Sequence, residues 1–273
     1  MLTTNNEVID ITIITVVKNN AEGIIKTLES INSQSFINYE HIIIDGNSTD
    51  GTSEIIKKKI NKKSIYFRKH DDSMYEAINN GIKKANGKYI GLLHSGDIYS
   101  SKDTLKLVFE NLDGLGLDFV FGNVAYFKFN KINRLWKFKS LKKKYLNPFK
   151  IAHTSLFIKQ KIIKDLNFYS QKLKISSDLD LLIKLCKNKY NFYKIDDFLI
   201  YMESGGLSFS LSNYAKKIKE DFFILINHYS FLCLFFYIYK ILIKFNGYFF
   251  LFSNSEIKKV QKQFTTLIKN HKL

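Results

Sequence analysis

Residues 41–52 read H-I-I-I-D-G-N-S-T-D-G-T, a short apolar run that ends in a cluster of polar side chains. Residues 11–20, I-T-I-I-T-V-V-K-N-N, and residues 89–97, Y-I-G-L-L-H-S-G-D, have the same arrangement. Short runs rich in β-branched residues are typical of strands buried on both faces of a parallel sheet. Because parallel strands end at the same edge, where open α/β sheets bind ligands, we expect the three polar clusters to form one rim.

Helical patterns separate these apolar runs along the first two-thirds of the chain. Residues 24–31, for example, place Ile24, Leu28 and Ile31 on one face of a helix. Strands are expected at residues 11–17, 41–44, 65–67, 89–93, 119–129, 155–158 and 192–195, and helices at 24–31, 52–59, 74–85, 104–112 and 179–187. This alternation predicts an α/β fold, with a mainly parallel sheet and helices on both faces.

The composition favours a packed domain in a reducing compartment. The chain has 273 residues, 45% of them apolar, and a single proline. Its two cysteines, Cys186 and Cys233, form no C-x-x-C pair and lie among apolar residues. We therefore expect buried thiols in the cytoplasm, and neither a disulfide framework nor a zinc site.

The formal net charge is +17, and the excess is uneven, because residues 131–150 contain eight lysines and arginines and no acidic residue. A surface of this charge attracts polyanions, anionic lipid head groups or phosphorylated substrates. Two interpretations of residues 131–150 stay open. They form a solvated loop, or they face a membrane or a phosphate-bearing acceptor.

The C-terminal part of the chain has a different pattern. Residues 214–228 are expected to form an amphipathic helix, and residues 229–252 are dominated by Phe, Leu, Ile and Tyr. A membrane span needs about 20 apolar residues, but Lys240 and Lys244 interrupt this stretch, and a buried lysine is costly there. A helix in the membrane interface is the preferred interpretation, followed by a buried hairpin or dimer face and then by a true span.

The rim itself offers carboxylates where the common phosphate loops, G-x-x-x-x-G-K-[ST] and G-x-G-x-x-G, are absent. Carboxylates repel a phosphate unless a hard cation such as Mg²⁺ or Mn²⁺ lies between them. Asp97 is the expected metal ligand, and Asp45 is expected to accept the imide N–H of a pyrimidine base. The simpler alternatives are turn residues, and Asp50 and Thr52 are more simply explained as caps of the helix at 52–59.

Seven short segments, in order, carry a resemblance to a known family. They are I-I-T-V-V-K-N (13–19), I-D-G-N-S-T-D-G-T (44–52), Y-E-A-I-N-N-G-I (75–82), L-H-S-G-D (93–97), H-T-S-L-F (153–157), S-S-D-L-D-L-L (176–182) and G-G-L-S (205–208). The series resembles the inverting family-2 glycosyltransferases, and within them the bacterial enzymes of O-antigen, capsule and exopolysaccharide assembly. The resemblance implies a GT-A fold, a Rossmann-like α/β architecture with a mixed, mainly parallel sheet flanked by helices, followed here by a helical, aromatic-rich appendage.

The resemblance also implies a role for each matching residue. Thr15 and Asp45 would hold the base and ribose, Asp71 would help to form the donor pocket, Asp97 would bind the metal, and Asp178 would be the general base. The nucleotide-sugar site would further include Val17, Asn19, Asn47, Ser48, Tyr75, Asn79, Ser95 and Gly96, while His153 and Ser177 would contact acceptor or donor. For His153 itself, a structural role is the favoured alternative. Asp180, two residues after Asp178, would point to another face of the helix.

Four positions depart from the family pattern. Gly96 stands where many relatives have a second aspartate, which leaves one metal carboxylate in the motif. His94 replaces an asparagine, Glu76 an aspartate, and Ser177 an acidic neighbour of the base.

The resemblance implies transfer of a hexosyl or N-acetylhexosaminyl group from a nucleotide sugar, with UDP favoured, to a saccharide or lipid-linked saccharide acceptor of a bacterial surface polysaccharide. Mn²⁺ or Mg²⁺ would neutralise the leaving diphosphate. We expect residues 1–210 to form the glycosyltransferase domain, with the nucleotide-sugar half at 1–130 and the acceptor half at 131–210. Residues 211–273 would form helices for membrane contact or homo-oligomerisation, and would place the enzyme in the cytoplasm at the inner face of the cytoplasmic membrane.

Two other classes of protein are weighed against this reading. A sugar-phosphate nucleotidyltransferase would share the rim and the metal, but residues 15–23 lack the Gly-rich, basic loop that a triphosphate needs. A basic nucleic-acid-binding protein would fit the charge, but no helix-turn-helix, zinc or RNA-recognition motif is visible. We therefore expect no nucleic-acid partner.

Overall fold

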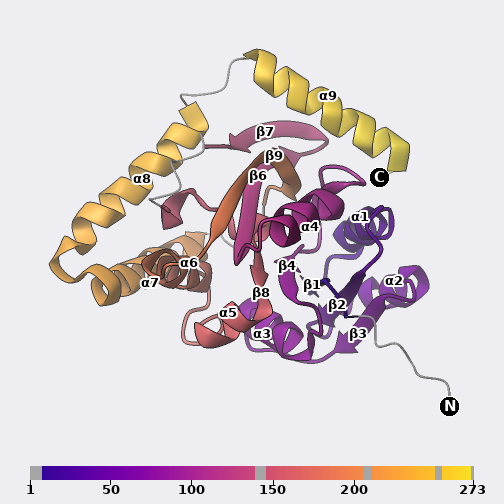
Figure 1. Ribbon diagram of the computed structural model, residues 1–273, viewed down its shortest axis with the longest axis horizontal. Coiled ribbons are helices and arrows are strands. Elements are labelled where there is room, and N and C mark those ends of the chain that lie inside the picture. The colour runs from indigo at the N-terminus through magenta and orange to yellow at the C-terminus, as the bar shows by residue number, and fades with distance from the viewer. Residues whose placement is uncertain (1–7, 139–145, 206–210, 250–253, 272–273) are drawn as a thin grey trace.

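The protein is described by a computed structural model for residues 8–138, 146–205, 211–249 and 254–271. Within these ranges, nine strands form one sheet in the order β3-β2-β1-β4-β8-β6-β9-β5, with β7 paired to β6 (Figure 1). The strands are β1 (Ile11–Val17), β2 (Tyr39–Asp45), β3 (Ser64–Arg68), β4 (Tyr89–Leu92), β5 (Ile98–Tyr99), β6 (Phe119–Lys128), β7 (Lys131–Trp136), β8 (Phe157–Lys159) and β9 (Phe192–Glu203).

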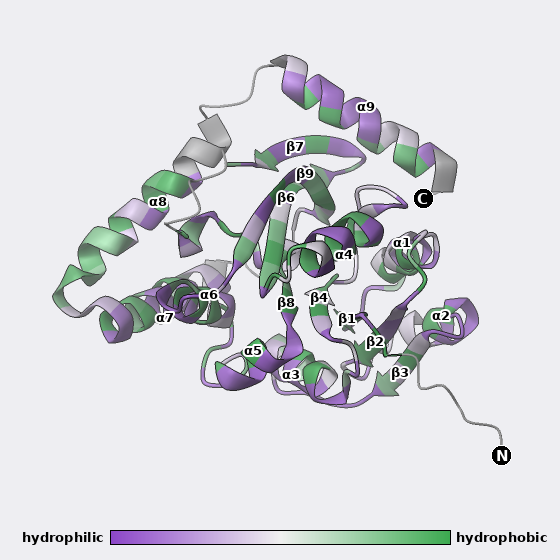
Figure 2. Ribbon diagram, viewed as in Figure 1, coloured by the Kyte–Doolittle hydropathy of each residue, from purple (hydrophilic) through white to green (hydrophobic). Residues whose placement is uncertain are grey.

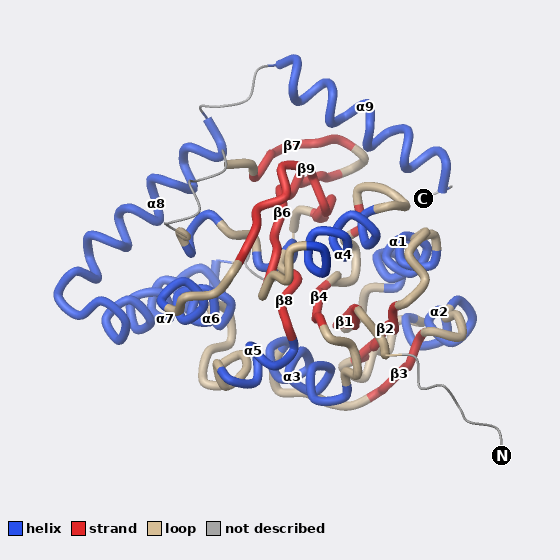
Figure 3. Tube along the Cα trace, viewed as in Figure 1, coloured by secondary structure: helices blue, strands red, loops and turns tan. Residues whose placement is uncertain are grey.

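Helices lie on both faces of the sheet, as Figure 3 shows for the chain trace. They are α1 (Ala21–Asn32), α2 (Thr52–Lys59), α3 (Met74–Lys84), α4 (Thr104–Gly114), α5 (Gln160–Asp165), α6 (Ser177–Lys187), α7 (Leu211–Tyr229), α8 (Cys233–Phe249) and α9 (Asn254–His271), with short 3₁₀ turns η1 (Pro148–Lys150), η2 (His153–Ser155) and η4 (Ser230–Leu232). The predicted mixed, mainly parallel α/β architecture is confirmed.

The first four strands form the parallel half of the sheet. β1 is buried along its whole length and pairs in parallel with β2 and with β4. The register pairs Val17 with Asp45, and Ile14 with Leu92. The polar residues after β1, β2 and β4 therefore meet at one edge, as the sequence predicts.

The other half of the sheet is mixed and differs from the prediction at β5, which was not predicted, at the end of β9, at β7 and at the start of β8. Residues 131–136, expected to be part of a basic loop, form β7, because Ile132, Leu135 and Trp136 are buried while Lys131 is exposed. Residues 155–158, expected to be a strand, begin as the η2 turn, and β8 follows at Phe157–Lys159. The Ser155 hydroxyl fixes that turn by donating to the carbonyl oxygens of Gly122 and Ala152, each at 2.9 Å.

Two hydrophobic clusters, one on each face, hold the helices on the sheet. One joins α1 and α4 to the C-terminal helices through Leu105, Val108 and Leu225. The other joins α3, α5 and α6 through Ile78, Ile162 and Leu182. Full burial of one such side chain stabilises the fold by about 1.5–3 kcal/mol, so these faces fix where the loops at the strand ends lie.

The C-terminal helices α7 and α8 form an antiparallel hairpin at the edge of the molecule (Figure 1). Residues Asn213–Lys244 have the length and hydropathy of a membrane span, with a mean hydropathy of 1.7. The chain nevertheless reverses at η4, where Ser230 has φ of 49°. The rings of Phe222 and Tyr237 stack with centroids 4.3 Å apart across the hairpin. The stretch therefore folds back on itself as two short helices, and residues 250–252 of the expected apolar segment lie outside the described ranges.

Candidate active site

The Asp45 carboxylate is buried at the end of β2 and is fully engaged by the protein itself. Its Oδ1 accepts the Ser48 backbone N–H at 2.8 Å, and its Oδ2 accepts the hydroxyls of Ser53 and Tyr66. Burial raises the pKa of Asp45, but the hydrogen bonds from Ser48, Ser53 and Tyr66 outweigh burial and lower it below its ordinary 3.8. In this conformation Asp45 shapes the turn that follows β2, and its contact with a base stays a prediction.

This geometry predicts the effect of Asp45→Asn on stability. Loss of the charge-assisted hydrogen bonds is expected to lower the free energy of unfolding by about 2 kcal/mol at neutral pH. Because the pKa is lower in the fold than in the unfolded chain, this contribution is present above the unfolded value of 3.8 and is lost as the pH falls through the folded value. Urea unfolding at about pH 7 and about pH 3 should show the difference shrink at acid pH. The exposed Asp197→Asn serves as control, and an equal deficit at both pH values would contradict the prediction.

The loops after β1 and β2 interlock at the rim. The Asn19 backbone N–H donates to the Ser48 hydroxyl at 2.9 Å, and the Thr49 N–H donates to Asn19 Oδ1 at 2.8 Å. Asn19 and Asn47 have φ of 51° and 59°, a left-handed conformation that asparagine tolerates. Both Asn19 and Asn47 are exposed, so their side chains line the rim, whereas Ser48 is buried beneath it.

Two further residues of the expected donor site lie inside the sheet. Thr15 is fully buried, and its hydroxyl donates to the Leu93 carbonyl at 2.8 Å and lies 2.9 Å from His41 Nε2. Val17 is also buried, and its carbonyl accepts the Gly46 N–H at 2.9 Å. Their expected nucleotide contacts stay predictions. In this conformation both residues position the loops around the site.

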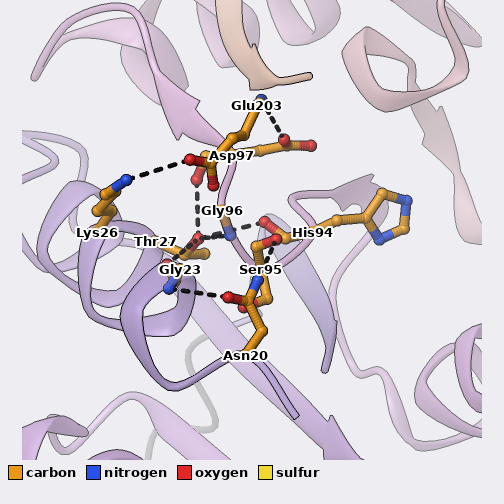
Figure 4. A network of polar contacts seen from close by, with 9 residues as sticks. All are labelled: Asn20, Gly23, Lys26, Thr27, His94, Ser95, Gly96, Asp97 and Glu203. Atoms are coloured by element: carbon orange, nitrogen blue, oxygen red, sulfur yellow. Dashed lines mark hydrogen bonds and ion pairs between the residues drawn. The ribbon is translucent and has the colours of Figure 1, made fainter. Parts of the chain in front are cut away.

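The turn at residues 94–97 is held from α1, as Figure 4 shows. Asn20 caps α1 by accepting the Gly23 N–H at 3.0 Å, and its amide donates to the Ser95 carbonyl at 3.2 Å. The Gly96 N–H donates to the Thr27 hydroxyl at 3.0 Å. These contacts fix the turn against the helix, so Asp97 projects from a rigid support.

Gly96 explains one departure from the family pattern. Its φ is +101°, and a Cβ built on it would lie 2.7 Å from Glu203 Oε2. The Glu203 carboxylate thus occupies the space that a side chain at residue 96 would need. Its own Oε1 pairs with Lys26 Nζ at 3.3 Å (Figure 4). A second carboxylate is present at the turn after all, supplied by the end of β9.

Asp97 is 3% exposed and has one unused oxygen. Its Oδ1 accepts the Glu203 backbone N–H at 3.1 Å, while Oδ2 has no hydrogen-bond partner among the described residues. Burial and the Glu203 charge raise the pKa of Asp97 well above its ordinary 3.8, against the lowering effect of the Glu203 N–H. A buried carboxylate in these surroundings is stabilised by a cation.

Asp178 lies in the first turn of α6, and its carboxylate contacts residues of other elements. Its Oδ1 lies 3.0 Å from the Tyr75 hydroxyl, and its Oδ2 lies 3.3 Å from His153 Nδ1. Burial raises the pKa of Asp178, but the His153 hydrogen bond and charge, together with Lys217 and Lys240, lower it well below 3.8. Asp178 is therefore ionised at neutral pH.

Asp180 points away from Asp178, as expected. Its Oδ1 lies 2.8 Å from His228 Nε2 and its Oδ2 lies 2.7 Å from Lys184 Nζ. These partners join α6 to α7. Asp180 therefore has a structural place outside the site.

Sequence reasoning missed Glu220, which anchors the loop before α6. The Glu220 carboxylate accepts the backbone N–H groups of Lys174, Ile175 and Ser176 at 2.8–2.9 Å. Because α7 provides this contact, Asp178 is left free of a capping role. The available signal was the acidic pair Glu220-Asp221 after a lysine-rich turn of α7, but the partners of Glu220 lie more than forty residues earlier.

Residues around α3 divide into ligand candidates and supports. Asn79 clamps Tyr169, donating to its carbonyl at 2.8 Å and accepting its N–H at 3.0 Å. Tyr75 is 1% exposed and stacks on Tyr169 with ring centroids 5.5 Å apart. Asp71 accepts the Asn80 amide through Oδ1 at 2.6 Å and keeps Oδ2 unpartnered among the described residues. The structure thus gives Asn79 a packing role, whereas Asp71 has an oxygen available to a ligand.

His94 and His153 lie between the turn of Asp97 and Asp178. Their ring centroids are 5.7 Å apart, and His153 in turn contacts Asp178. Burial, together with the His153 charge, lowers the pKa of His94 to about 3, so its ring is neutral. A line of contacts therefore runs from the turn of Asp97 through His94 and His153 to Asp178.

Buried polar atoms without a partner gather along this line. Among the described residues, the unpartnered side-chain atoms at the site are Asp71 Oδ2, His94 Nδ1 and Nε2, Ser95 Oγ, Asp97 Oδ2, His153 Nε2 and Ser177 Oγ. An unsatisfied buried polar group costs about 1–3 kcal/mol, so such a concentration indicates a place where a polar ligand binds.

A comparison with protein families identifies the family of the chain. The profile of glycosyl transferase family 2 matches residues 12–166, more than half of the chain. The chain belongs to this family. It is a glycosyltransferase, and neither the nucleotidyltransferase nor the nucleic-acid interpretation is favoured.

Relatives of known sequence fall in archaea and bacteria. The uncharacterized glycosyltransferase MJ1057 of Methanocaldococcus jannaschii is 30% identical over 216 residues, which cover 75% of this chain and 74% of the relative. Some relatives are much longer, since a segment 36% identical to an uncharacterized glycosyltransferase of Rickettsia bellii covers 42% of this chain and 16% of that protein. The expected bacterial surface-polysaccharide subgroup stays a prediction.

Solved structures confirm the expected GT-A fold. Staphylococcus aureus TarS 1-349 in complex with UDP superposes with a TM-score of 0.65 at 17% identity, covering 96% of this chain and 72% of that one. The mannosyltransferase PcManGT from Pyrobaculum calidifontis, in complex with GDP-Man and Mn²⁺, gives a TM-score of 0.57 at 14% identity, covering 95% and 75%.

The residues present are compatible with a divalent cation. Within the described ranges, no group of three His, Cys, Asp or Glu side chains forms a ready-made metal cage. Asp97 nevertheless offers a buried, unpartnered oxygen, and Glu203 places a second carboxylate at the same turn. Mg²⁺ and Mn²⁺ sites in phosphate-binding enzymes commonly use one or two carboxylates and complete the shell with phosphate oxygens and water.

Proposed function

We propose that the protein is an inverting, metal-dependent glycosyltransferase that moves a hexosyl or N-acetylhexosaminyl group from a nucleotide sugar, with UDP favoured, to a saccharide or lipid-linked saccharide. The supporting observation is the line of unpartnered polar atoms from Asp97 to Asp178. Asp97 at one end suits the donor, and ionised Asp178 at the other suits an acceptor hydroxyl.

Asp178 would act as general base in a single in-line displacement. The acceptor hydroxyl attacks the anomeric carbon opposite the nucleotide diphosphate, and Asp178 accepts its proton as the new bond forms. Tyr75 and His153 hold one carboxylate oxygen each, so the carboxylate is oriented before the substrate arrives. Direct displacement from one face inverts the configuration at the anomeric carbon.

Asp97 would hold the cation, with Glu203 beside it. A bound Mg²⁺ or Mn²⁺ supplies charge neutralisation for the leaving diphosphate. The chain's own contribution is to keep Asp97 rigid through Thr27, Asn20 and the Glu203 N–H. Glycosyltransferase structures of this fold carry UDP in one case, and GDP-Man with Mn²⁺ in the other, which supports both the donor class and the metal.

We further propose that the enzyme works at the inner face of the cytoplasmic membrane in assembly of a surface polysaccharide. The support is the outer face of the α7–α8 hairpin (Figure 2). Five apolar side chains there are 50–88% exposed: Phe231, Leu234, Phe235, Ile238 and Leu242. An apolar helix face flanked by lysines binds well at a membrane interface. The alternative is that two copies of the chain form a dimer through the same face.

A thermal-shift screen tests the donor and the metal together. UDP-sugars with Mn²⁺ are expected to raise the melting temperature more than UDP-sugars with EDTA, since ligands that bind only the folded state stabilise it by mass action. At a hundredfold excess over Kd the gain is about 2.7 kcal/mol. GDP-sugars and free sugars under the same conditions serve as controls. Absence of a shift with every nucleotide sugar, metal present, would refute the proposal.

A further inference from the structure

The imidazole of His94 is held in place by contacts that do not use its own polar atoms. The His94 carbonyl accepts the Thr27 hydroxyl at 3.2 Å and the Asp97 backbone N–H at 2.9 Å, so the backbone at this residue is fixed. The ring extends away from these contacts, as Figure 4 shows. Both ring nitrogens are buried, and neither has a hydrogen-bond partner among the described residues. The turn therefore presents an imidazole whose nitrogens are available to a ligand.

His153, in the η2 turn, presents a third such nitrogen beside His94. The centroids of the two rings are 5.7 Å apart, and the ring planes are inclined at 51°. His153 places Nδ1 against Asp178, whereas its Nε2 is buried and lacks a partner within the described ranges. Three imidazole nitrogens are thus left unsatisfied between the turn of Asp97 and the carboxylate of Asp178.

The chemistry of the His94 ring indicates what kind of ligand satisfies it. An unpartnered buried nitrogen destabilises the fold, and a packing role would be filled as well by an apolar ring. Burial lowers the pKa of His94 to about 3, so at neutral pH the ring has one N–H donor and one acceptor nitrogen. A hydroxyl group both donates and accepts, whereas the diphosphate of a nucleotide sugar only accepts. A neutral imidazole therefore suits a sugar better than it suits the diphosphate.

The proposed reaction requires the sugar to lie at this point of the site. In an in-line displacement, the anomeric carbon lies between the leaving diphosphate and the attacking hydroxyl. Under the proposed function the diphosphate is held at the turn of Asp97, and the hydroxyl is held by Asp178. His94 and His153 are the side chains whose contacts span the interval between these two groups.

We propose that His94, with His153 beside it, hydrogen-bonds the sugar of the donor and so determines which sugar the enzyme accepts. This inference rests on the proposed function and assigns its sugar specificity to a residue. A site built to hydrogen-bond a substrate hydroxyl discriminates against sugars that lack that hydroxyl or present it in another orientation. His94 stands where the family pattern has an asparagine, and an imidazole differs from an amide in reach and in rigidity. The departure from the pattern at residue 94 therefore changes the group that meets the sugar.

Binding of UDP and of UDP-sugars to His94→Phe tests this assignment without turnover. The variant keeps an aromatic ring beside His153 and removes both nitrogens. Calorimetry with Mn²⁺ compares UDP with UDP-glucose, UDP-galactose and their two N-acetylhexosamine counterparts. The affinity for the UDP-sugar that the wild type prefers is expected to fall at least about fivefold, because hydrogen bonds to the sugar are lost. The affinity for UDP itself should change less than about twofold.

A second variant and a matched control separate recognition from folding. His94→Asn, which restores the residue of the family pattern, is expected to alter the ratio of affinities among the four UDP-sugars at least about threefold and to leave UDP binding unchanged. His228→Phe is the control, because His228 is also partly buried but has partners for both nitrogens, in Asp180 and Lys187. It should lower the melting temperature and leave the preference among sugars intact. Ligand-free His94→Phe should melt no lower than the wild type, because it removes two unsatisfied nitrogens.

Three results would overturn the assignment of His94. They are equal loss of UDP and UDP-sugar affinity in His94→Phe, a lower melting temperature of that variant without ligand, and a wild type that binds UDP with no preference among the four sugars. The first two would show that His94 supports the turn, and the third that the histidines do not contact the sugar. Absence of UDP binding in the wild type would instead count against the proposed function.

Discussion

Asp178→Asn is expected to abolish sugar transfer while donor binding persists. The amide keeps the size and the Tyr75 contact of the carboxylate but cannot accept the acceptor's proton. Loss of a general base lowers the rate by about 10²–10⁴-fold. The turn of Asp97, where we propose that the donor binds, lies across His94 and His153 from the substitution, so the affinity for UDP should change less than about twofold.

The measurement combines turnover of a UDP-sugar with calorimetric binding of UDP to the same preparation. Asp180→Asn is the matched control, because it is the same change on the same helix, two residues away. Asp180 contacts Lys184 and His228 and faces away from the site, so that variant is expected to lose some stability and retain turnover. Normal turnover by Asp178→Asn, or equal loss in both variants, would remove Asp178 from the role of base.

Elements with one strong local pattern were predictable from the sequence. The run at residues 11–17 and the helix at 52–59 were predicted with the bounds that the structure gives them. For longer elements, the predicted bounds ended too early, at the point where the sequence pattern weakens. The prediction for β9 ended at residue 195 because Asp196 and Asp197 interrupt the apolar alternation there. The strand nevertheless continues to Glu203, because it lies between β6 and β5 and pairs with both. No local sequence pattern indicates that β9 pairs with β6.

The strand at residues 131–136 shows a different limit. We predicted a charged loop because Lys131 and Arg134 belong to a basic stretch, although Ile132, Leu135 and Trp136 are apolar. Burial of that face depends on α9, where Val260 and Phe264 are 2% and 0% exposed. Contacts over more than 120 residues cannot be inferred from local periodicity, and tertiary packing decided the outcome.

Within the site, motif positions were easier to predict than their supports. The segments around Asp97 and Asp178 could be placed because they follow strands or begin helices. The places of Glu203 and Glu220 could not be predicted, because their partners lie far away in sequence. The Glu203 backbone N–H donates to Asp97, and the Glu220 carboxylate accepts the Ile175 N–H. Conversely, Asn79 lies in a motif and yet clamps Tyr169, because polar side chains in buried helices often satisfy neighbouring backbone groups.

Asp97→Asn is the second change with a large expected effect, and its consequences for function and stability run in opposite directions. Without the carboxylate the turn cannot hold a cation, so transfer is expected to fall at least about a hundredfold, and Mn²⁺ should no longer add to the thermal shift given by UDP. Asp97 is buried, and its Oδ2 has no partner among the described residues, so in metal-free protein the asparagine replaces a carboxyl group whose ionised form is disfavoured by burial and by Glu203. The metal-free variant should therefore melt no lower than the wild type.

Melting curves with EDTA, with UDP and with UDP plus Mn²⁺ measure both effects in one experiment. Asp103→Asn is the control, since Asp103 is exposed and bonds only to groups of the nearby loops such as Ser35. A full Mn²⁺ increment in Asp97→Asn would show that another group holds the metal, and Glu203→Gln would then be the variant that loses it. A lower metal-free melting temperature would instead show that the Glu203 N–H bond to Asp97 outweighs its buried charge. The fold would then depend on Asp97 directly, and stability and catalysis would not be opposed at this turn.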